Sequence, residues 1–276
     1  MSRRLFQTEA ETLEKLGRHA KIPQLFAYFE ENQDFYLVQE FIPGQTLAQI
    51  LLGQLLPEDQ VIHLLTEVLD ILVFVHGQKV IHRDIKPENL IRRQTDGKIV
   101  LIDFGAVKEL VTQTINQQEQ TTKTVTIGTI GYMPIEQFHG DPQFNSDIYA
   151  LGIVVIQALT GLLPNQLSKL RDPSNPSTGE IVWSHRVPHL HPKLVDILNK
   201  MVRFDCRQRY QSASEILNDL TNLSNKYQHW RHLQWKAPSL VWTGVAALNR
   251  KVDQCDRTLG KKNSTFSSKT ECDWFS

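Results

Sequence analysis

The chain carries the run His-Arg-Asp-Ile-Lys-Pro-Glu-Asn at residues 82–89 and Asp-Phe-Gly at residues 103–105. This pair of motifs limits what the chain can fold into more than any other feature, because both must reach the same place. Residues 79–81 form an extended apolar piece before the first motif, and residues 98–102 form a strand-like run before the second. Both motifs therefore lie on loops that leave rigid elements, where catalytic groups usually lie.

Three side chains in these motifs supply a matched set of oxygen groups. The carboxylate of Asp84 can orient a hydroxyl or accept its proton, while the Asn89 amide and the Asp103 carboxylate can hold Mg²⁺. Asn89 follows Asp84 by five residues, which is the spacing that this phosphoryl-transfer signature requires. Asp-Phe-Gly alone would be a weak signal, because a strand end followed by a turn often has this sequence, but the full order and spacing are specific.

The same pattern continues with Gly128-Thr129, Glu136 and Asp147. With these residues the chain resembles a eukaryotic-type serine/threonine protein kinase of the kind that bacteria also carry, over residues 4–223. The resemblance implies an α+β fold with a mostly helical large lobe and a small lobe reduced to helix C and two strands. We expect the partial small lobe at residues 1–40, the large lobe at 41–223 and a C-terminal tail at 224–276.

The resemblance also assigns catalytic and nucleotide-binding roles. It makes Asp84 and Lys86 catalytic together with Asn89 and Asp103, and the last two would also hold Mg²⁺. Lysine at position 86 is typical of the Ser/Thr class, and Thr129 resembles the threonine that fixes Asp84 and Lys86 there. ATP is the expected cofactor, since residues 39–44 match the hinge whose backbone holds adenine. The nucleotide-binding set would be Glu40, Ile42, Ile91, Asn89 and Asp103.

Other residues receive structural or regulatory roles by the same resemblance. Asp147 would accept hydrogen bonds from the backbone of the catalytic loop, and Glu136 would pair with a late arginine, here Arg209. Residues 133–136 read Met-Pro-Ile-Glu in place of the usual Ala-Pro-Glu order, so we expect modest local consequences. Glu9 matches the helix C glutamate. Arg83 would receive a phosphorylated loop at residues 106–127, whose candidate sites are Thr121, Thr122, Thr124 and Thr126.

Local patterns predict the elements of both lobes. A helix is expected at residues 5–16, and two strands are expected at 25–29 and 35–39 with a polar turn at 30–34. Four longer helices are expected in the large lobe. They run from Pro57 to Gly77, from Ser146 to Thr160 with Gly161 as its stop, from Pro192 to Met201, and from a capping box at residues 212–215 to about Leu223.

The phosphate-binding parts that normally precede these motifs in a kinase are missing from the 276 residues. Such an enzyme cradles the phosphates with a Gly-rich loop and pairs a strand lysine with the helix C glutamate. The eight residues before Glu9 contain neither glycine nor lysine. We therefore expect a two-stranded hairpin whose apolar face, like that of helix C, lies partly open to water. Such exposure marks a surface covered by a partner or an aggregation risk.

Composition narrows the function classes. The formal net charge is zero, so nothing points to nucleic acid or an anionic membrane as a partner. The three cysteines are few and scattered, which suits a reducing compartment, and we expect a cytoplasmic protein. The apolar run at residues 240–248 is nine residues long, against ~20 for a membrane span, so we expect none.

Two hypotheses of function remain. In the first, the chain is a serine/threonine kinase acting on protein substrates, impaired as it stands because of a truncation or a late start codon. In the second, it is a non-catalytic kinase-like module, a pseudokinase, that binds partners. The intact set of Asp84, Asn89 and Asp103 favours the first hypothesis, because a binding module has no need to keep all three.

Overall fold

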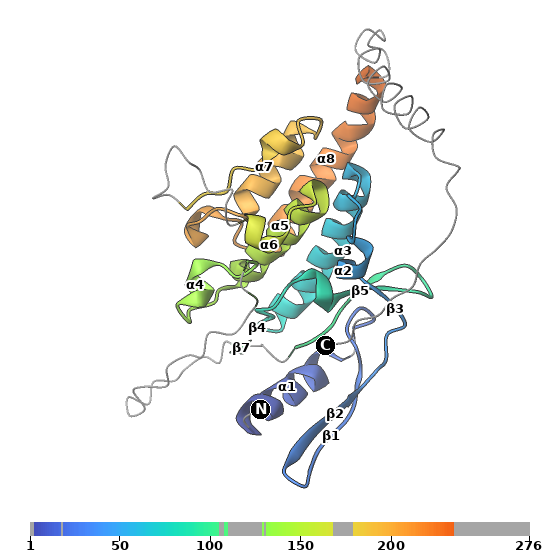
Figure 1. Cartoon of the computed structure of the whole chain (residues 1–276), viewed down its shortest axis with the longest axis vertical. Coiled ribbons are helices and arrows are strands. Elements are labelled where there is room, and N and C mark those ends of the chain that lie inside the picture. Colours follow the sequence, from blue (N-terminus) through green and yellow to red (C-terminus); the bar gives the residue numbers. More distant parts are fainter. Residues whose placement is uncertain are drawn as a thin grey trace, which may run out of the picture. The chain divides into compact units, whose positions relative to one another are not determined.

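The computed structural model describes residues 3–17, 19–104, 108–109, 129, 131–167 and 179–234 (Figure 1). The chain divides into two compact units, Met1–Asn225 and Lys226–Ser276. The first unit combines helices with short antiparallel strands, which confirms the predicted α+β class.

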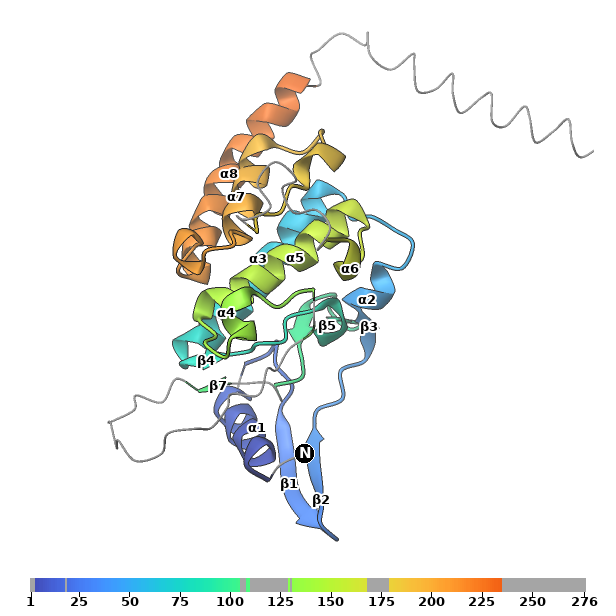
Figure 2. The ribbon, with the colours of Figure 1, turned by 60° about the vertical axis from the view of Figure 1, so that its left-hand side comes forward.

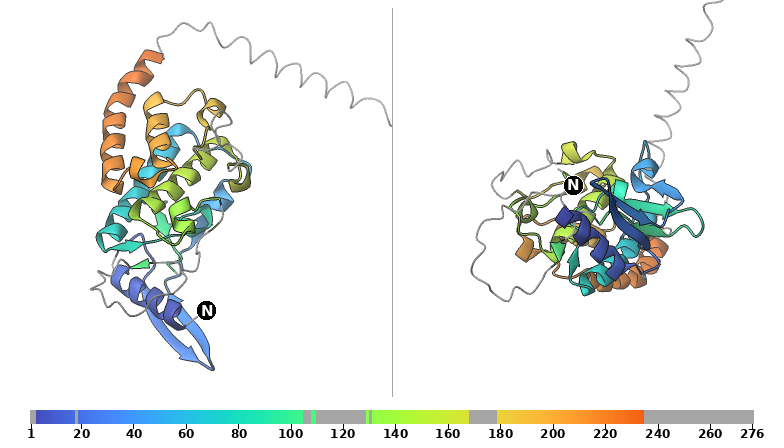
Figure 3. Two further views of the ribbon diagram at one scale, coloured as in Figure 1. Left: turned by 90° about the vertical axis from the view of Figure 1, so that its left-hand side faces the viewer. Right: turned by 90° about the horizontal axis from the view of Figure 1, so that it is seen from below.

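The N-terminal part consists of one helix against one hairpin. Helix α1 (Arg3–Leu16) packs on strands β1 (Leu25–Glu31) and β2 (Asp34–Gln39), as Figure 3 shows. The ring of Phe6 lies 4.9 Å from that of Phe35 and 6.2 Å from that of Tyr28. Both strands are longer than predicted. They meet at a two-residue turn whose residues, Asn32 and Gln33, have φ of 53° and 68°, the left-handed geometry that suits tight hairpins.

A small three-stranded sheet connects this part to the helical part. Its order is β3 (Gly44–Thr46), β5 (Leu90–Arg93) and β6 (Ile99–Leu101), all antiparallel. Gly44 faces Arg93 so closely that a Cβ added at Gly44 would lie 2.2 Å from the Arg92 carbonyl oxygen. Only glycine fits there. A second ladder pairs β4 (Val80–Ile81) with β7 (Lys108–Glu109).

The helical part is built around two buried helices. Helix α3 (Glu58–Gly77) and helix α5 (Phe144–Thr160) pack together, and α7 (Pro192–Met201) packs on α5 (Figure 2). Helix α5 is apolar and buried almost all round, as predicted, and Gly161 ends it in the left-handed conformation with φ of 69°. The remaining described helices are α2 (Leu47–Ile50), α4 (Ile135–Phe138), α6 (Pro164–Leu167) and α8 (Ala213–Gln234).

Two predicted helix boundaries need correction, and one short helix was not predicted. Helix α5 begins at Phe144 and not at Ser146, because Gln143 and Ser146 form a reciprocal capping box. Helix α8 continues to Gln234, since residues 224–234 contain no glycine or proline to stop it. Helix α2 was not predicted. Its four residues are too few for a periodic pattern, although Thr46 and Gln49 cap it reciprocally.

Helix α3 is long and apolar enough to cross a membrane by length and composition alone. Half of its apolar stretch is buried inside the structure, and its buried residues include Glu67. A buried core helix of a globular domain can have the same length and apolar composition. Among the described residues no other helix is long and apolar enough to cross a membrane.

Candidate active site

The first motif forms a compact triangle of side chains around Asp84. Lys86 Nζ donates to Asp84 Oδ2 at 2.5 Å and to Thr129 Oγ1 at 3.1 Å. The Thr129 hydroxyl in turn donates to Asp84 Oδ1 at 2.9 Å. Burial by itself would raise the pKa of Asp84, but the hydrogen bonds from Lys86 and Thr129 hold that pKa below its usual value. The triangle therefore fixes an ionised carboxylate in one orientation.

Asn89 ties this triangle to the second motif. It lies at the end of a short 3₁₀ turn (Pro87–Asn89), and its Nδ2 donates to the Asp84 backbone oxygen at 2.9 Å and to Asp84 Oδ2 at 3.1 Å. The Asn89 carbonyl accepts from the Ile102 amide at 3.0 Å. Ile102 precedes Asp103, which is exposed and has a left-handed φ of 66°. The bond from the Ile102 amide brings the residue before Asp103 against the backbone of Asn89.

Asp147 of α5 supports the loop that carries Asp84. Its Oδ1 accepts from the Arg83 amide at 2.8 Å, and its Oδ2 accepts from the His82 amide at 2.9 Å. The ring of His76 also lies against it, with Nε2 2.9 Å from Oδ2. Burial would raise the pKa of Asp147, yet the His76 hydrogen bond and the nearby histidines keep it lowered. Sequence reasoning missed His76, which the pattern shows only as a histidine in the last turn of α3.

His82 is fully buried beneath the loop. Its Nδ1 accepts from the Asp84 amide at 3.3 Å, and its Nε2 lies 3.2 Å from the Ile102 carbonyl. The ring therefore bonds at both nitrogens as a neutral imidazole with the proton on Nε2. Burial lowers the pKa of His82, against the opposing charge of Asp147. Phe104 packs edge-on against the same ring at 4.7 Å.

Arg83 and Arg209 lie in contrasting surroundings. Arg83 is 7% exposed, and within the part of the chain that the structure describes its buried Nε and Nη2 atoms have no hydrogen-bond partner. Burial lowers the pKa of this guanidinium. Arg209, in contrast, forms two bonds to Glu136, Nη1 to Oε1 at 2.6 Å and Nη2 to Oε2 at 3.0 Å. This ion pair forms although Met-Pro-Ile precedes Glu136.

The candidate phosphorylation sites Thr121, Thr122, Thr124 and Thr126 lie outside the described residues.

The nucleotide-binding candidates Glu40, Ile42 and Ile91 lie in the coil between β2 and β3 and in strand β5. Ile42 is buried in the coil between β2 and β3, and Ile91 pairs with Thr46 within the sheet. The backbone of Glu40 bonds to that of Gln24 at 2.8 Å. Glu9 of α1 faces the loop of Asp103. Its pKa is raised by burial first and by the charge of Asp103 second.

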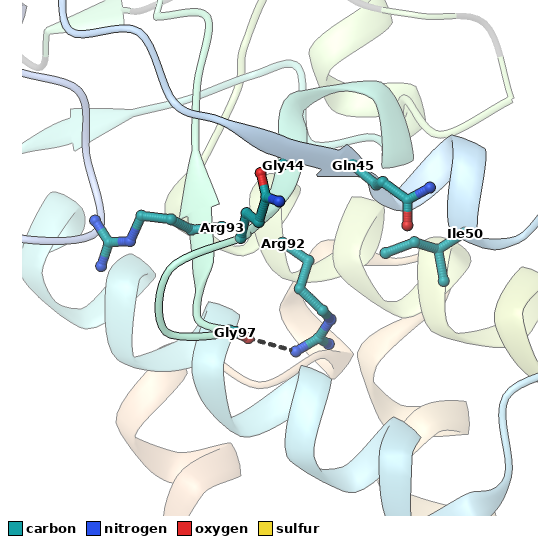
Figure 4. A pocket seen from close by; sticks show the side chains of 7 residues that line it. Gly44, Gln45, Ile50, Arg92, Arg93 and Gly97 are labelled. Carbon is teal, nitrogen blue, oxygen red and sulfur yellow. Dashed lines mark hydrogen bonds between the residues drawn. The ribbon is translucent and has the colours of Figure 1, made fainter.

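A separate cavity of about 470 Å³ opens beside β3 and β5, and Figure 4 shows its lining. The Arg92 and Arg93 side chains point apart at its edge. Arg92 donates to the Gly97 carbonyl at 2.7 Å, and Arg93 pairs with Asp96 at 2.8 Å. Both cations are thus already engaged within the chain, and the residues of the Asp84 triangle do not line this cavity.

The fold and the Asp84 cluster are those of a protein kinase. The chain belongs to the protein kinase domain family, whose model matches residues 1–220. It is 44% identical over 226 residues to serine/threonine-protein kinase C of Synechocystis sp., covering 81% of this chain and 41% of that protein. It is 43% identical over 217 residues to serine/threonine-protein kinase PknA of Nostoc sp., covering 78% and 38%. The chain therefore spans about two fifths of the length of the curated relatives that it matches.

Proposed function

We propose that this chain transfers the γ-phosphate of ATP to serine or threonine hydroxyls of protein substrates. The observation that carries the proposal is the triangle of Asp84, Lys86 and Thr129, joined by bonds of 2.5, 3.1 and 2.9 Å. A carboxylate held this way can orient a hydroxyl for attack, and the adjacent lysine can reach the transferring phosphate. The names of the relatives, all serine/threonine-protein kinases, support the same class of acceptor.

The residues around Asp84 fit ATP and Mg²⁺. Asp103 offers an exposed carboxylate, and Asn89, which uses Nδ2 to bond Asp84, keeps its amide oxygen as an acceptor. Carboxylate and amide oxygens are suitable ligands for this hard cation. Bound Mg²⁺ would offset negative charge on the phosphate oxygens. The coil that holds Glu40 and Ile42 would supply backbone groups to adenine, with Ile91 contacting the base.

We further propose that the 276-residue chain by itself binds ATP weakly and turns over slowly. It contains no Gly-x-Gly-x-x-Gly run, so the phosphates lack the amides of such a loop. Catalysis of phosphoryl transfer is largely positioning and electrostatic stabilisation, and losing one such donor commonly costs ~10²–10³ in rate. A cytoplasmic location stays a prediction from the cysteine content.

One observation favours the second function, a non-catalytic binding module. The β1–β2 hairpin and the coil after it expose large apolar side chains to solvent, Phe26 by 62% and Phe41 by 85%. Phe29 and Tyr36 stack on each other at 5.2 Å and are also exposed. Such a cluster is suited to contact with further polypeptide that covers the small lobe.

Calorimetry with Mg-ATP and a phosphate-transfer assay on the purified chain test the proposal. Any transfer should disappear in Asp84→Ala and in Asp103→Ala, while Asp59→Ala, an exposed carboxylate in the first turn of α3, should keep it. Transfer that survives both site substitutions would show that the cleft is misassigned. Micromolar ATP binding with turnover near ~1 s⁻¹ would contradict the expected weakness of this chain. Complete absence of transfer with retained partner binding would favour the second function.

A further inference from the structure

Gln137 makes a buried contact to the catalytic loop that no motif indicates. It lies in α4, one residue after Glu136, and is 2% exposed. Its Nε2 donates to the backbone carbonyl of Arg83 at 2.6 Å. Figure 2 shows α4 beside β4, from which the chain runs into the catalytic loop. The contact therefore joins the end of the Thr129–Glu136 segment to the residue just before Asp84.

The backbone of Arg83 needs such support. Its φ is 70°, a left-handed conformation that is unfavourable for a residue with a Cβ. Strain of this kind persists only where the surroundings hold it. The Arg83 amide is held by Asp147 Oδ1 at 2.8 Å, and its carbonyl is held by Gln137. Two side chains from α5 and α4 thus fix both peptide groups of the residue that sets the direction of Asp84.

We propose that Gln137 is a positioning residue for phosphate transfer. By holding the Arg83 carbonyl it keeps the catalytic loop in the strained conformation that orients Asp84. The inference rests on the proposed function and adds to it a residue that touches no reactant.

Hydrogen bonds to the neighbouring Glu136 fix the position of α4 and therefore of Gln137. Glu136 is bound at both oxygens by the fully buried side chain of Arg209, and Ser146 Oγ adds a bond of 2.8 Å to Glu136 Oε1. These bonds anchor the helix turn from which the Gln137 amide reaches Arg83. A buried amide is costly unless it is bonded, so simple core filling would favour an apolar side chain at this position.

Two variants of similar size test the role. Gln137→Met removes the donor and keeps the length of the side chain. Gln137→Glu keeps the shape but puts a carboxylate oxygen against the Arg83 carbonyl. In both we expect kcat to fall ~10- to 100-fold with little change in KM for Mg-ATP, since a misplacement of about 1 Å costs this much. Thermal unfolding of each variant shows whether it folds, and Gln208→Met, on an exposed 3₁₀ turn, is the control.

The pH dependence separates positioning from loss of packing. The carboxyl introduced by Gln137→Glu can donate to the Arg83 carbonyl only when protonated, and burial favours that form. The charged residues bonded to the same segments are Asp147, which binds the Arg83 amide, and Arg209, which binds the neighbouring Glu136; Arg83 itself carries the carbonyl that Gln137 binds. Relative to the unmodified chain, Gln137→Glu should regain activity from pH 8 to pH 6, whereas Gln137→Met should not. Equal pH profiles for the two variants would overturn the inference.

Amide hydrogen exchange tests the same contact without any catalytic readout. Loss of the Gln137 bond should lower the protection of the Arg83 amide about tenfold at constant pH. If the unmodified chain transfers no phosphate, the proposed function fails, but this loss of protection would still support loop positioning by Gln137. Unchanged kcat in an active Gln137→Met protein, or unchanged Arg83 protection in either case, would overturn the inference.

Discussion

The backbone amide of Arg83 donates a hydrogen bond of 2.8 Å to Oδ1 of Asp147, which lies 64 residues further along the chain. The other oxygen of Asp147 accepts from the His82 amide at 2.9 Å and lies 2.9 Å from His76 Nε2. A buried carboxylate is costly unless it is hydrogen-bonded in this way. Helix α5 therefore holds the loop that carries Asp84.

Replacing Arg209 by lysine should destabilise the protein strongly. The Arg209 side chain is fully buried and forms two bonds to Glu136 as well as bonds to the Arg203 and Phe204 carbonyls. Lysine cannot reproduce this fork of donors. We expect Arg209→Lys to lower the free energy of unfolding by about 2–4 kcal/mol, as measured by urea denaturation.

Arg207→Lys is the matched control, because Arg207 pairs with Asp205 at the surface and its side chain is 86% exposed. That variant should leave the free energy of unfolding almost unchanged. If both variants lose the same free energy of unfolding, then neither the burial of Arg209 nor its two hydrogen bonds to Glu136 explains how much that ion pair stabilises the protein.

Stability should fall as the pH is lowered below about 6.5, the usual pKa of histidine. Burial lowers the pKa of His82, and burial with the charge of Lys21 lowers that of His19, so both bind protons less readily in the folded chain than in the unfolded chain. The unfolded chain binds protons there first, so the folded state loses stability between this pH and the lowered folded pKa values. Asp147, whose pKa is also lowered, adds a further loss only below about pH 4.

Urea unfolding at pH 8, 7, 6 and 5.5 measures this slope. His82→Phe should flatten it even though the variant is less stable throughout. A slope that persists unaltered in His82→Phe would assign the pH dependence to other groups.

The phosphoacceptor should be serine or threonine. Lys86 and Thr129 close the triangle around Asp84, and this arrangement matches the resemblance to the Ser/Thr class. Phosphoamino-acid analysis of a phosphorylated protein substrate is the measurement, and dominant phosphotyrosine would contradict the assignment. Thr129→Val should lower kcat ~10-fold or more, because it removes a hydrogen bond that orients Asp84.

Phosphate should be found within residues 121–126 in an active preparation. Among the described residues, the buried Nε and Nη2 atoms of Arg83 have no hydrogen-bond partner, and phosphate oxygens are strong acceptors for such groups. Mass spectrometry should locate phosphate on Thr121, Thr122, Thr124 or Thr126 and not on Thr112 or Thr114. A fully active sample without phosphate across the 121–126 cluster would remove this role for Arg83.

Local sequence determined the chemistry of the site and the main helices. Asp84 and Asn89 lie on one loop, and Asp103 lies just after the end of one strand. Motifs of this short range can be recognised in the sequence. The burial of α5 and its stop at Gly161 were predicted for the same reason, because a continuous apolar pattern and a left-handed glycine act over a few residues.

Only the tertiary structure decided which side chains hold the catalytic loop. His76 reaches Asp147 across 71 residues, and Gln137 reaches Arg83 across 54. Neither residue belongs to a pattern of period two or 3.6, so no local signal distinguishes them from other polar side chains. Their roles arise because packing of α3, α4 and α5 leaves backbone groups of a strained loop buried, and buried polar groups must be hydrogen-bonded by whichever side chains the fold brings within reach.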